Sequence, residues 1–162
     1  DVVKKSPLKA RGYYNAGVAL AAKGFVEKAI QYYEGAIALK PGYTKAHINL
    51  GALYNSKGRI DNAIEHYETA LRARPDIAEA HNGLGNAYDA KGWTDQAIAH
   101  YQMAVSLRPD YVAAHYNLAV AYESEGREDM AVEHHLIALK FLPVFEEAQN
   151  NLSRIYSKRK KP

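Results

Sequence analysis

The chain has 162 residues, of which 48% are hydrophobic and 24% charged, and its formal net charge at pH 7 is +3. This composition is typical of a single soluble domain and shows no break that would mark a linker. The absence of cysteine excludes disulfides, thiolate zinc sites and cysteine nucleophiles, and no apolar run approaches the roughly 18 residues that a membrane span needs.

The first nine residues, Asp1–Lys9, are predicted to form an N-terminal extension, and they lack the apolar core of a signal peptide. We therefore expect a cytoplasmic protein. A start at Asp1 without methionine and a ragged basic end are typical of a segment taken from a longer protein.

Four prolines recur at a constant spacing along the chain: Pro41, Pro75, Pro109 and Pro143. Self-similarity at a period of about 34 residues is the signature of a solenoid, whose units stack because none can bury its apolar face alone. The predicted repeats are residues 10–43, 44–77, 78–111 and 112–145. Residues 146–157 repeat the first half of a unit and are predicted to form a closing helix.

Small and aromatic residues recur in register with the prolines. One glycine column is complete: Gly24, Gly58, Gly92 and Gly126. A second has alanine in its fourth place: Gly17, Gly51, Gly85 and Ala119. An aromatic column ends in histidine: Tyr33, Tyr67, Tyr101 and His135. Each unit therefore reads as a helix of roughly 13 residues, a glycine turn, a second helix and a proline turn, and helices this short need stacking to persist in water.

An acidic residue is expected in the first turn of every second helix: Glu27, Asp61, Asp95 and Asp129. A carboxylate there suits the positive end of the helix dipole. Acids spaced so regularly cannot converge on one substrate, so we interpret them as structural rather than catalytic.

The second unit matches, in order, the 34-residue signature of the tetratricopeptide repeat through His47, Leu50, Gly51, Tyr54, Gly58, Ala63, Tyr67, Ala70 and Pro75. The chain resembles a tetratricopeptide repeat protein from residue 10 to about residue 156. The resemblance implies an all-α, right-handed superhelical solenoid of four helical hairpins plus a C-terminal capping helix. The first helix of each hairpin would face the concave side.

Asparagine recurs on this predicted concave side, although it is not a good helix former. Four of five first helices carry it at one height, with Gly83 as the interruption: Asn15, Asn49, Asn117 and Asn151. The other predicted peptide-binding residues are Tyr14, Asn82, Asn86 and Tyr116. A side-chain amide donates and accepts, so such a ladder can hold the backbone of an extended peptide. Alternatively, each asparagine bonds to the neighbouring repeat and only stiffens the stack.

The asparagine column, with Asn49-Leu50-Gly51 and Asn117-Leu118-Ala119, resembles the repeat region of O-linked N-acetylglucosamine transferase and its plant fucosyltransferase relatives. That resemblance implies that the groove holds substrate polypeptides for a separate catalytic domain. Nothing in the sequence resembles that domain.

Charged residues on the same side change sign along the chain, from basic Arg11 and Lys45 to acidic Glu79, Asp89, Glu123 and Glu147. We predict that this gradient orients a bound segment, with its acidic part near the two basic residues.

The tail, residues 158–162, carries four positive charges, which exceeds the net charge of the whole chain, so the repeats are close to neutral. Such a tail is usually solvated, and a nuclear-import or nucleic-acid patch is the alternative. Because the repeats lack a basic groove, we do not expect RNA as a partner.

Two series of histidines also recur, His47, His81 and His115 in one and His66, His100 and His134 in the other. Equivalent positions on stacked repeats lie about 10 Å apart, too far to share a zinc ion. We therefore expect packing or surface roles, with no metal and no cofactor. A chaperone carboxylate clamp would need lysine and arginine on three first helices, and only its asparagines are present.

No nucleotide-binding or hydrolase motif is complete. Gly83-Leu84-Gly85 begins a dinucleotide-binding fingerprint, but Tyr88 stands where the third glycine of that fingerprint would be needed. The sequence thus predicts a non-enzymatic scaffold or adaptor that binds an extended peptide or helix in its groove. One alternative is a structural scaffold that self-assembles through an uncapped N-terminal face with Tyr13, Leu20 and Phe25. The other is the substrate-recognition segment of an O-linked glycosyltransferase.

Overall fold

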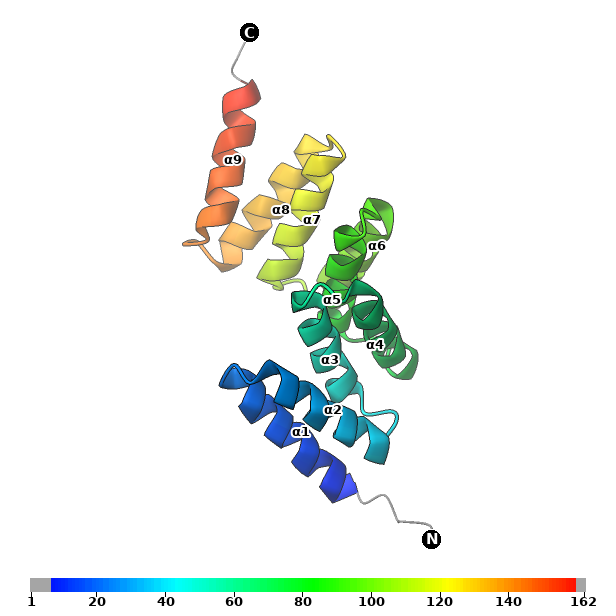
Figure 1. Ribbon diagram of the computed structural model, residues 1–162. Helices are drawn as coiled ribbons and strands as arrows, with labels where there is room; N and C mark the ends of the chain where they lie inside the picture. The colour runs from blue at the N-terminus through cyan, green and yellow to red at the C-terminus, as the bar shows by residue number, and fades with distance from the viewer. Residues whose placement is uncertain (1–6, 160–162) are drawn as a thin grey trace. The chain divides into compact units, whose positions relative to one another are not determined.

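The computed structural model describes residues 7–159, which form nine α-helices (Figure 1). They are α1 (Pro7–Ala22), α2 (Val26–Leu39), α3 (Thr44–Ser56), α4 (Ile60–Ala73), α5 (Ala78–Ala90), α6 (Thr94–Leu107), α7 (Val112–Ser124), α8 (Glu128–Phe141) and α9 (Glu146–Arg159). The chain divides into two compact units, residues 1–76 with α1–α4 and residues 77–162 with α5–α9. Each unit is described by itself.

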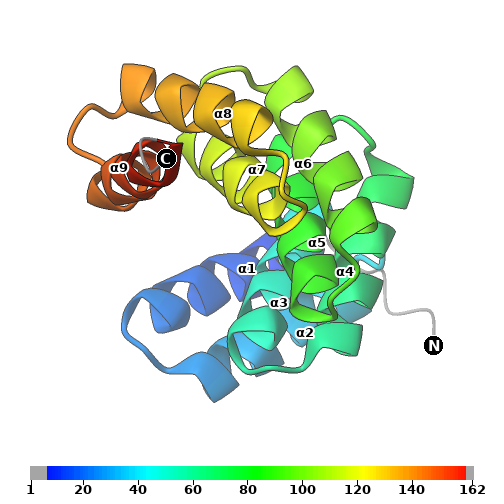
Figure 2. The same cartoon turned by 90° about the horizontal axis from the view of Figure 1, so that it is seen from above.

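The all-α repeat fold predicted from the constant spacing of the repeat columns is confirmed. First helices α3, α5 and α7 have 13 residues each, and second helices α2, α4, α6 and α8 have 14. In both views α1 lies beside α2 in the first unit and α7 beside α8 in the second (Figure 1 and Figure 2). The right-handed superhelical twist stays a prediction.

The first and last helices, α1 and α9, extend beyond the residue limits predicted from the sequence. Helix α1 begins at Pro7, within the predicted extension, and α9 continues to Arg159. Residues 1–6 and 160–162, which hold most of that extension and of the basic tail, lie outside the described residues.

The complete glycine column ends the first helix of each hairpin. The four glycines have φ between 71° and 79°, a left-handed conformation that glycine adopts without strain. At the first turn, Gly24 N donates to Ala21 O over 2.9 Å and Phe25 N to Leu20 O over 2.9 Å. These bonds satisfy carbonyls that the helix end would otherwise leave unpaired.

Inside three hairpins, a buried tyrosine ring lies against a glycine of the facing helix. A Cβ atom added to Gly17, Gly51 or Gly85 would come within 2.7, 2.9 or 2.5 Å of the ring of Tyr33, Tyr67 or Tyr101, respectively. Glycine therefore lets the two helices approach closely.

In the fourth hairpin, both the glycine and the tyrosine of this contact are replaced. Ala119 supplies the Cβ that the other hairpins lack, and the smaller His135 replaces the tyrosine; both are fully buried. The two departures from the repeat pattern thus compensate each other in volume.

Acidic residues begin the second helices, as predicted, and two of them also join neighbouring repeats. Glu27, at the start of α2, forms an ion pair with Lys57, which follows α3. Asp129, at the start of α8, pairs with Arg159 at the end of α9 over 2.7 Å. These exposed pairs contribute modestly to stability, but they repeat at the same spacing.

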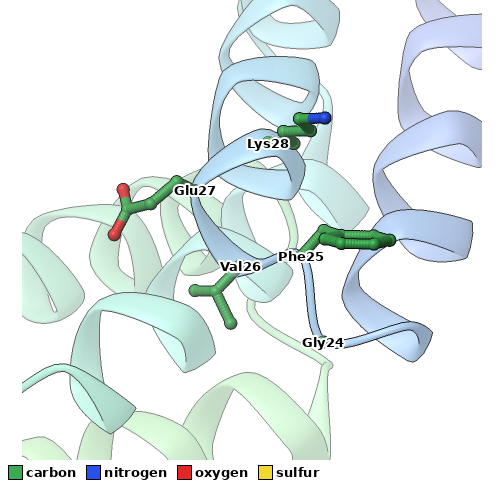
Figure 3. A pocket seen from close by; sticks show the side chains of 5 residues that line it. All are labelled: Gly24, Phe25, Val26, Glu27 and Lys28. Carbon is green, nitrogen blue, oxygen red and sulfur yellow. The ribbon is translucent and has the colours of Figure 1, made fainter.

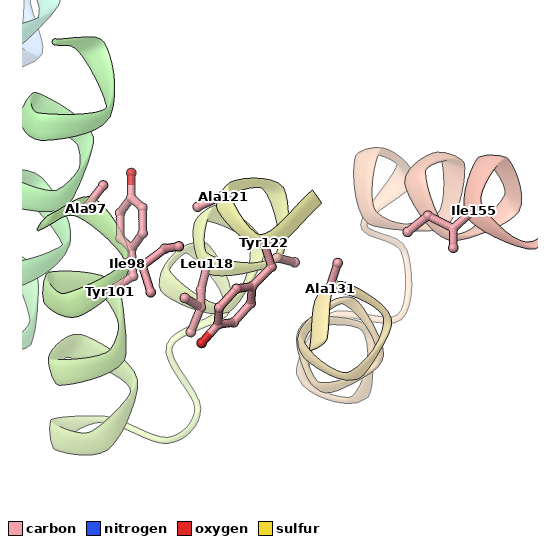
Figure 4. Close-up of a cluster of buried hydrophobic side chains, with 9 residues drawn as sticks. Ala97, Ile98, Tyr101, Leu118, Ala121, Tyr122, Ala131 and Ile155 are labelled. Atoms are coloured by element: carbon pink, nitrogen blue, oxygen red, sulfur yellow. The ribbon is translucent and has the colours of Figure 1, made fainter. Parts of the chain in front are cut away.

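In the second unit, a cluster of buried apolar side chains runs through the last four helices (Figure 4). Its members come from α6 (Ala97, Ile98 and Tyr101), α7 (Leu118, Ala119, Ala121 and Tyr122), α8 (Ala131) and α9 (Ile155). Ile155 shows that α9 closes the array by covering the last hairpin. The polar residues Glu147, Asn150, Arg154 and Lys158 of α9 are exposed, as expected for a cap.

Replacing Gly51 by alanine should lower the free energy of unfolding by about 1–3 kcal/mol, because the added methyl group overlaps the buried Tyr67 ring. In a Tyr67→His background, the same change should raise it by up to about 1 kcal/mol, since alanine is the better helix former. Guanidinium denaturation of the four proteins measures both effects. An equal cost of Gly51→Ala in the two backgrounds would contradict this account of the contact.

Candidate functional site

In the first unit, the predicted binding residues Asn49 and Tyr14 are joined by a hydrogen bond between successive first helices. The amide nitrogen of Asn49, on α3, donates to the hydroxyl of Tyr14 on α1 over 3.4 Å and to that of Tyr33 on α2 over 3.0 Å. Burial raises the pKa of Tyr33, and the bond from Asn49 offsets part of that rise. The Tyr33 hydroxyl therefore stays protonated at neutral pH.

The second unit repeats this arrangement with asparagines as acceptors. The amide nitrogen of Asn117, on α7, donates to Oδ1 of Asn82 over 3.0 Å and to Oδ1 of Asn86 over 2.9 Å, both on α5. Tyr101 donates its hydroxyl to the same Asn86 oxygen over 2.8 Å. Burial raises the pKa of Tyr101, and Asp89 raises it further, so this hydroxyl remains a donor.

These bonds use the donor half of each amide. Asn49 and Asn117 both direct their NH2 groups to the neighbouring repeat, as they would if their role were to stiffen the stack of repeats. The Oδ1 atom of each accepts no hydrogen bond from a described residue, and neither oxygen is buried. Each residue therefore presents a fixed acceptor, rather than the donor and acceptor expected from the sequence.

The other members of the asparagine column lack such bonds. Asn15 on α1 is exposed and Asn151 on α9 is half-buried, and neither side chain bonds to another described residue. Tyr116 is half-buried on α7, where its ring centroid lies 5.6 Å from that of His135 and 4.9 Å from that of Phe145. The equivalent Tyr14 ring lies 5.8 Å from Tyr33 and 5.1 Å from Tyr43.

Two of the predicted groove acids are already neutralised within the second unit. Glu79 forms an ion pair with Arg108 over 2.5 Å. Glu123 accepts from Nε2 of His135 over 2.8 Å and pairs with Arg154. The exposed Arg11, Lys45 and Asp89 form no ion pair with a described residue.

The histidines form pairs that sequence reasoning missed. Nδ1 of His47 lies 2.9 Å from Nδ1 of His66, and the same distance separates His81 from His100 and His115 from His134. Each pair joins the two helices of one hairpin. The recurrence of both series at the repeat period was the available signal, because it keeps each pair in register.

A surface pocket lies at the turn between α1 and α2 (Figure 3). It is lined by Gly24, Phe25, Val26, Glu27 and Lys28. The Glu27 carboxylate points away from the Phe25 ring, and Nζ of Lys28 lies 5.5 Å from the centre of that ring.

Residues 7–159 contain neither a membrane-spanning helix nor a cluster of metal ligands. No helix there is both long and apolar enough to cross a lipid bilayer. The same residues contain no group of three or more histidine, cysteine, aspartate or glutamate side chains arranged to hold a metal ion.

Replacing Asn117 by alanine should lower the free energy of unfolding by about 1–3 kcal/mol, because the buried Asn82 oxygen loses the donor that Asn117 provides. Asn151→Ala, at the equivalent position of α9, should change it by less than about 0.5 kcal/mol. Urea denaturation compares the two. Equal changes would show that the inter-repeat bonds of Asn117 do not stabilise the second unit.

Comparisons with known proteins agree with the repeat pattern. One family model, described as "TPR repeat", matches residues 51–92 and 85–126, and two others, described as "Tetratricopeptide repeat", match residues 1–44 and 114–141. No curated protein sequence matches the chain significantly.

Solved structures of MamA are similar to this chain. One is 27% identical, with 93% of this chain and 82% of that chain covered and a TM-score of 0.81. MamA from Desulfovibrio magneticus RS-1, from residue 41 to its end, is 25% identical over 88% of this chain and 78% of its own, with a TM-score of 0.75.

A third solved structure, YrrB, is described as a tetratricopeptide repeat protein with an unusual peptide-binding site. It is 23% identical over 97% of this chain and 79% of its own, with a TM-score of 0.78, and so shows the fold alone. The repeat columns, the helical hairpins and these matches lead to one conclusion: the chain belongs to the tetratricopeptide repeat family of interaction scaffolds.

Proposed function

We propose that this interaction scaffold binds an extended segment of a partner protein, using the Oδ1 atoms of Asn49 and Asn117 as acceptors for backbone N–H groups. The observation that carries the proposal is the pair of equivalent asparagines, each held by two bonds through its nitrogen and each left with an accessible oxygen. Backbone N–H groups suit such acceptors because every residue except proline offers one.

Prior fixation of the amides favours binding. A side chain that is already held in one rotamer loses little conformational freedom when a ligand arrives. Each new hydrogen bond contributes only about 0.5–1.5 kcal/mol net, so the segment must also make apolar contacts. The half-buried ring of Tyr14 lies beside the Asn49 amide, and that of Tyr116 is half-buried on α7, so each unit offers an aromatic contact. The other proposed binding residues are Asn15 in the first unit and Asn82, Asn86 and Asn151 in the second.

Charge favours an acidic stretch of the partner on the first unit. Arg11 and Lys45 are exposed on α1 and α3 and form no ion pair with a described residue. In the second unit, Glu79 and Glu123 are paired with arginines, which leaves the exposed Asp89 and Glu147 as the acids for a basic stretch. The polarity proposed here thus rests on Arg11 and Lys45 more than on the acids.

A peptide selected on the chain from a random displayed library should bind at least tenfold more weakly to the Asn49→Ala, Asn117→Ala double variant than to the wild type. The physical reason is the loss of both fixed acceptors. Methylation of peptide backbone nitrogens should weaken wild-type binding at particular positions and have a smaller effect on the variant. Titration calorimetry measures all four combinations.

The matched control is Gln96→Ala, which removes an exposed amide from α6, a second helix. It should leave the affinity unchanged. Circular dichroism must show that the double variant is folded at the temperature of the titration. Equal binding of a selected peptide to the folded double variant and to the wild type would overturn the proposal.

Self-association is a second candidate, and a specific observation favours it. The first hairpin exposes several large apolar side chains: Tyr13 (45%), Val18 (40%), Phe25 (52%) and Tyr32 (39%). Exposed apolar residues that gather on one helical hairpin mark interaction surfaces more often than single, scattered ones do.

If this surface joins copies of the chain, the mass measured by light scattering should rise with protein concentration, and Phe25→Ser should lower it toward the monomer value at each concentration. The expected cause is the loss of apolar area that a contact would bury. Leu136→Ser, on α8, is the control, since that side chain is equally exposed at 50%. A monomer mass across a wide dilution series would contradict self-association.

A further inference from the structure

Three hairpins are each closed by a direct contact between two imidazoles. The Nδ1 atoms lie 2.9 Å apart in His47–His66, His81–His100 and His115–His134. The ring centroids are separated by 5.1 to 5.2 Å. At this separation one nitrogen must carry a hydrogen and the other must not, because two bare nitrogens or two N–H groups would repel.

The neighbouring carbonyl groups decide which nitrogen is bare. Nε2 of His47 lies 2.8 Å from the carbonyl oxygen of Pro41, and Nε2 of His115 lies 2.9 Å from that of Pro109. A carbonyl oxygen only accepts, so both Nε2 atoms carry hydrogen and donate. In α9 the equivalent residue is Gln149, whose Nε2 donates to Pro143 O over 2.7 Å.

This fixes the neutral form of the pairs His47–His66 and His115–His134. With hydrogen on Nε2, neutral His47 and His115 have a bare Nδ1, which accepts from the Nδ1–H of His66 or His134. One added proton is accommodated, because a single hydrogen still lies between the two Nδ1 atoms. A second added proton places N–H against N–H and two positive charges about 5 Å apart, so the contact must break.

The surroundings of His115–His134 favour the neutral form. Helix α7 contributes Tyr122, whose ring is stacked 5.8 Å from His134 and whose hydroxyl accepts from Gln102 of α6. Helix α8 contributes Glu133 and His135, and His135 is bonded to Glu123, which Arg154 of α9 also neutralises. Burial lowers the pKa of His134, and His115 lowers it further, while Glu133 opposes them.

The pair His47–His66 has a similar setting. Tyr54 of α3 stacks 5.4 Å from His66, its hydroxyl donates to Glu34 of α2, and Arg59 lies over its ring. Burial lowers the pKa of His66, and His47 adds to this effect, while Glu65 and Glu34 oppose it.

We propose that the three histidine pairs are acid-sensitive contacts, which hold the two helices of hairpins two, three and four together while at most one imidazole of a pair is charged, and release them when both are. The first hairpin is a natural control. It places Tyr13 and Tyr32 at the equivalent positions, with ring centroids 5.7 Å apart, and neither side chain gains a proton in mild acid.

The direction of the pH effect follows from the lowered pKa values. In the unfolded chain, His66 and His134 have the ordinary histidine pKa of about 6.5, and folding lowers it. Between that value and their lower folded pKa, the unfolded chain binds more protons than the folded one. The contribution of the pairs to stability is therefore complete above about pH 6.5 and falls as the pH drops below it.

Long-range proton–nitrogen NMR of the imidazoles of the full chain tests the geometry. At pH 7.5, His47 and His115 should be protonated on Nε2, and His66 and His134 should be protonated on Nδ1, which is the less common neutral form. Protonation of His66 and His134 on Nε2 would overturn the proposal, because no hydrogen would then lie between the paired Nδ1 atoms.

Stability against pH tests the consequence. The His47→Gln, His115→Gln double variant copies Gln149, so it keeps a donor for the proline carbonyls and removes the doubly charged state from two of the three pairs. The guanidinium midpoint of the wild type should fall between pH 7.5 and 5.0, and that of the variant should fall by clearly less. Equal falls, with the variant folded at pH 7.5, would overturn the proposal.

Hydrogen exchange locates the effect within the wild-type chain. After correction for intrinsic rates, lowering the pH from 7.5 to 5.5 should reduce protection in α3–α4 and α7–α8 more than in α1–α2. Equal loss of protection in the tyrosine-paired hairpin would overturn the assignment to the histidines.

Discussion

The contact between a tyrosine ring and a glycine is the constraint on which each hairpin depends. A helix as short as α3 or α4 is only marginally stable alone in water. Its narrow apolar face is buried only when the other helix of the hairpin packs closely against it. In three hairpins the ring occupies the space that a Cβ atom would need, so the helices come close and the alanines on either side are fully buried. The fourth hairpin keeps the same fit with Ala119 and His135. What the fold requires is therefore the combined volume of two residues, rather than a glycine as such.

Polar side chains then set how hairpins join. At three of the period-marking prolines, the residue six positions later donates to the proline carbonyl. The donor is a ring nitrogen at His47 and His115 and a side-chain amide at Gln149. Asn49 and Asn117 tie successive first helices together, and the pairs Glu27–Lys57 and Asp129–Arg159 tie second helices to the next repeat. The same asparagines thus serve the stack through nitrogen and remain available to a partner through oxygen. The stiffening and binding roles do not exclude each other, because they use different atoms.

The period of the repeat columns was enough to predict the fold, because glycine, alanine, tyrosine and proline each hold a position that backbone geometry or close packing dictates. The ends of the array were harder to predict: α1 and α9 extend past the expected limits, where no repeat column marks the boundary. The histidine pairs were missed because the two partners lie on facing helices, and their separation in space appears only once the hairpin angle is known. Likewise, the sequence located the asparagines but not the donors they use, since that depends on whether Tyr14, Tyr33 or Asn82 lies within reach.

The functional account depends on one claim, that the amide oxygens of Asn49 and Asn117 receive backbone N–H groups of a bound segment. The most direct measurement is the scalar coupling across a hydrogen bond, recorded by NMR between a 15N-labelled bound peptide and the chain with 13C-labelled asparagine. The account predicts a coupling from peptide backbone nitrogen to Cγ of Asn49 or Asn117, with the bonds from their own NH2 groups retained. A bound peptide that shows no such coupling and makes its nuclear Overhauser contacts only with second helices would contradict it.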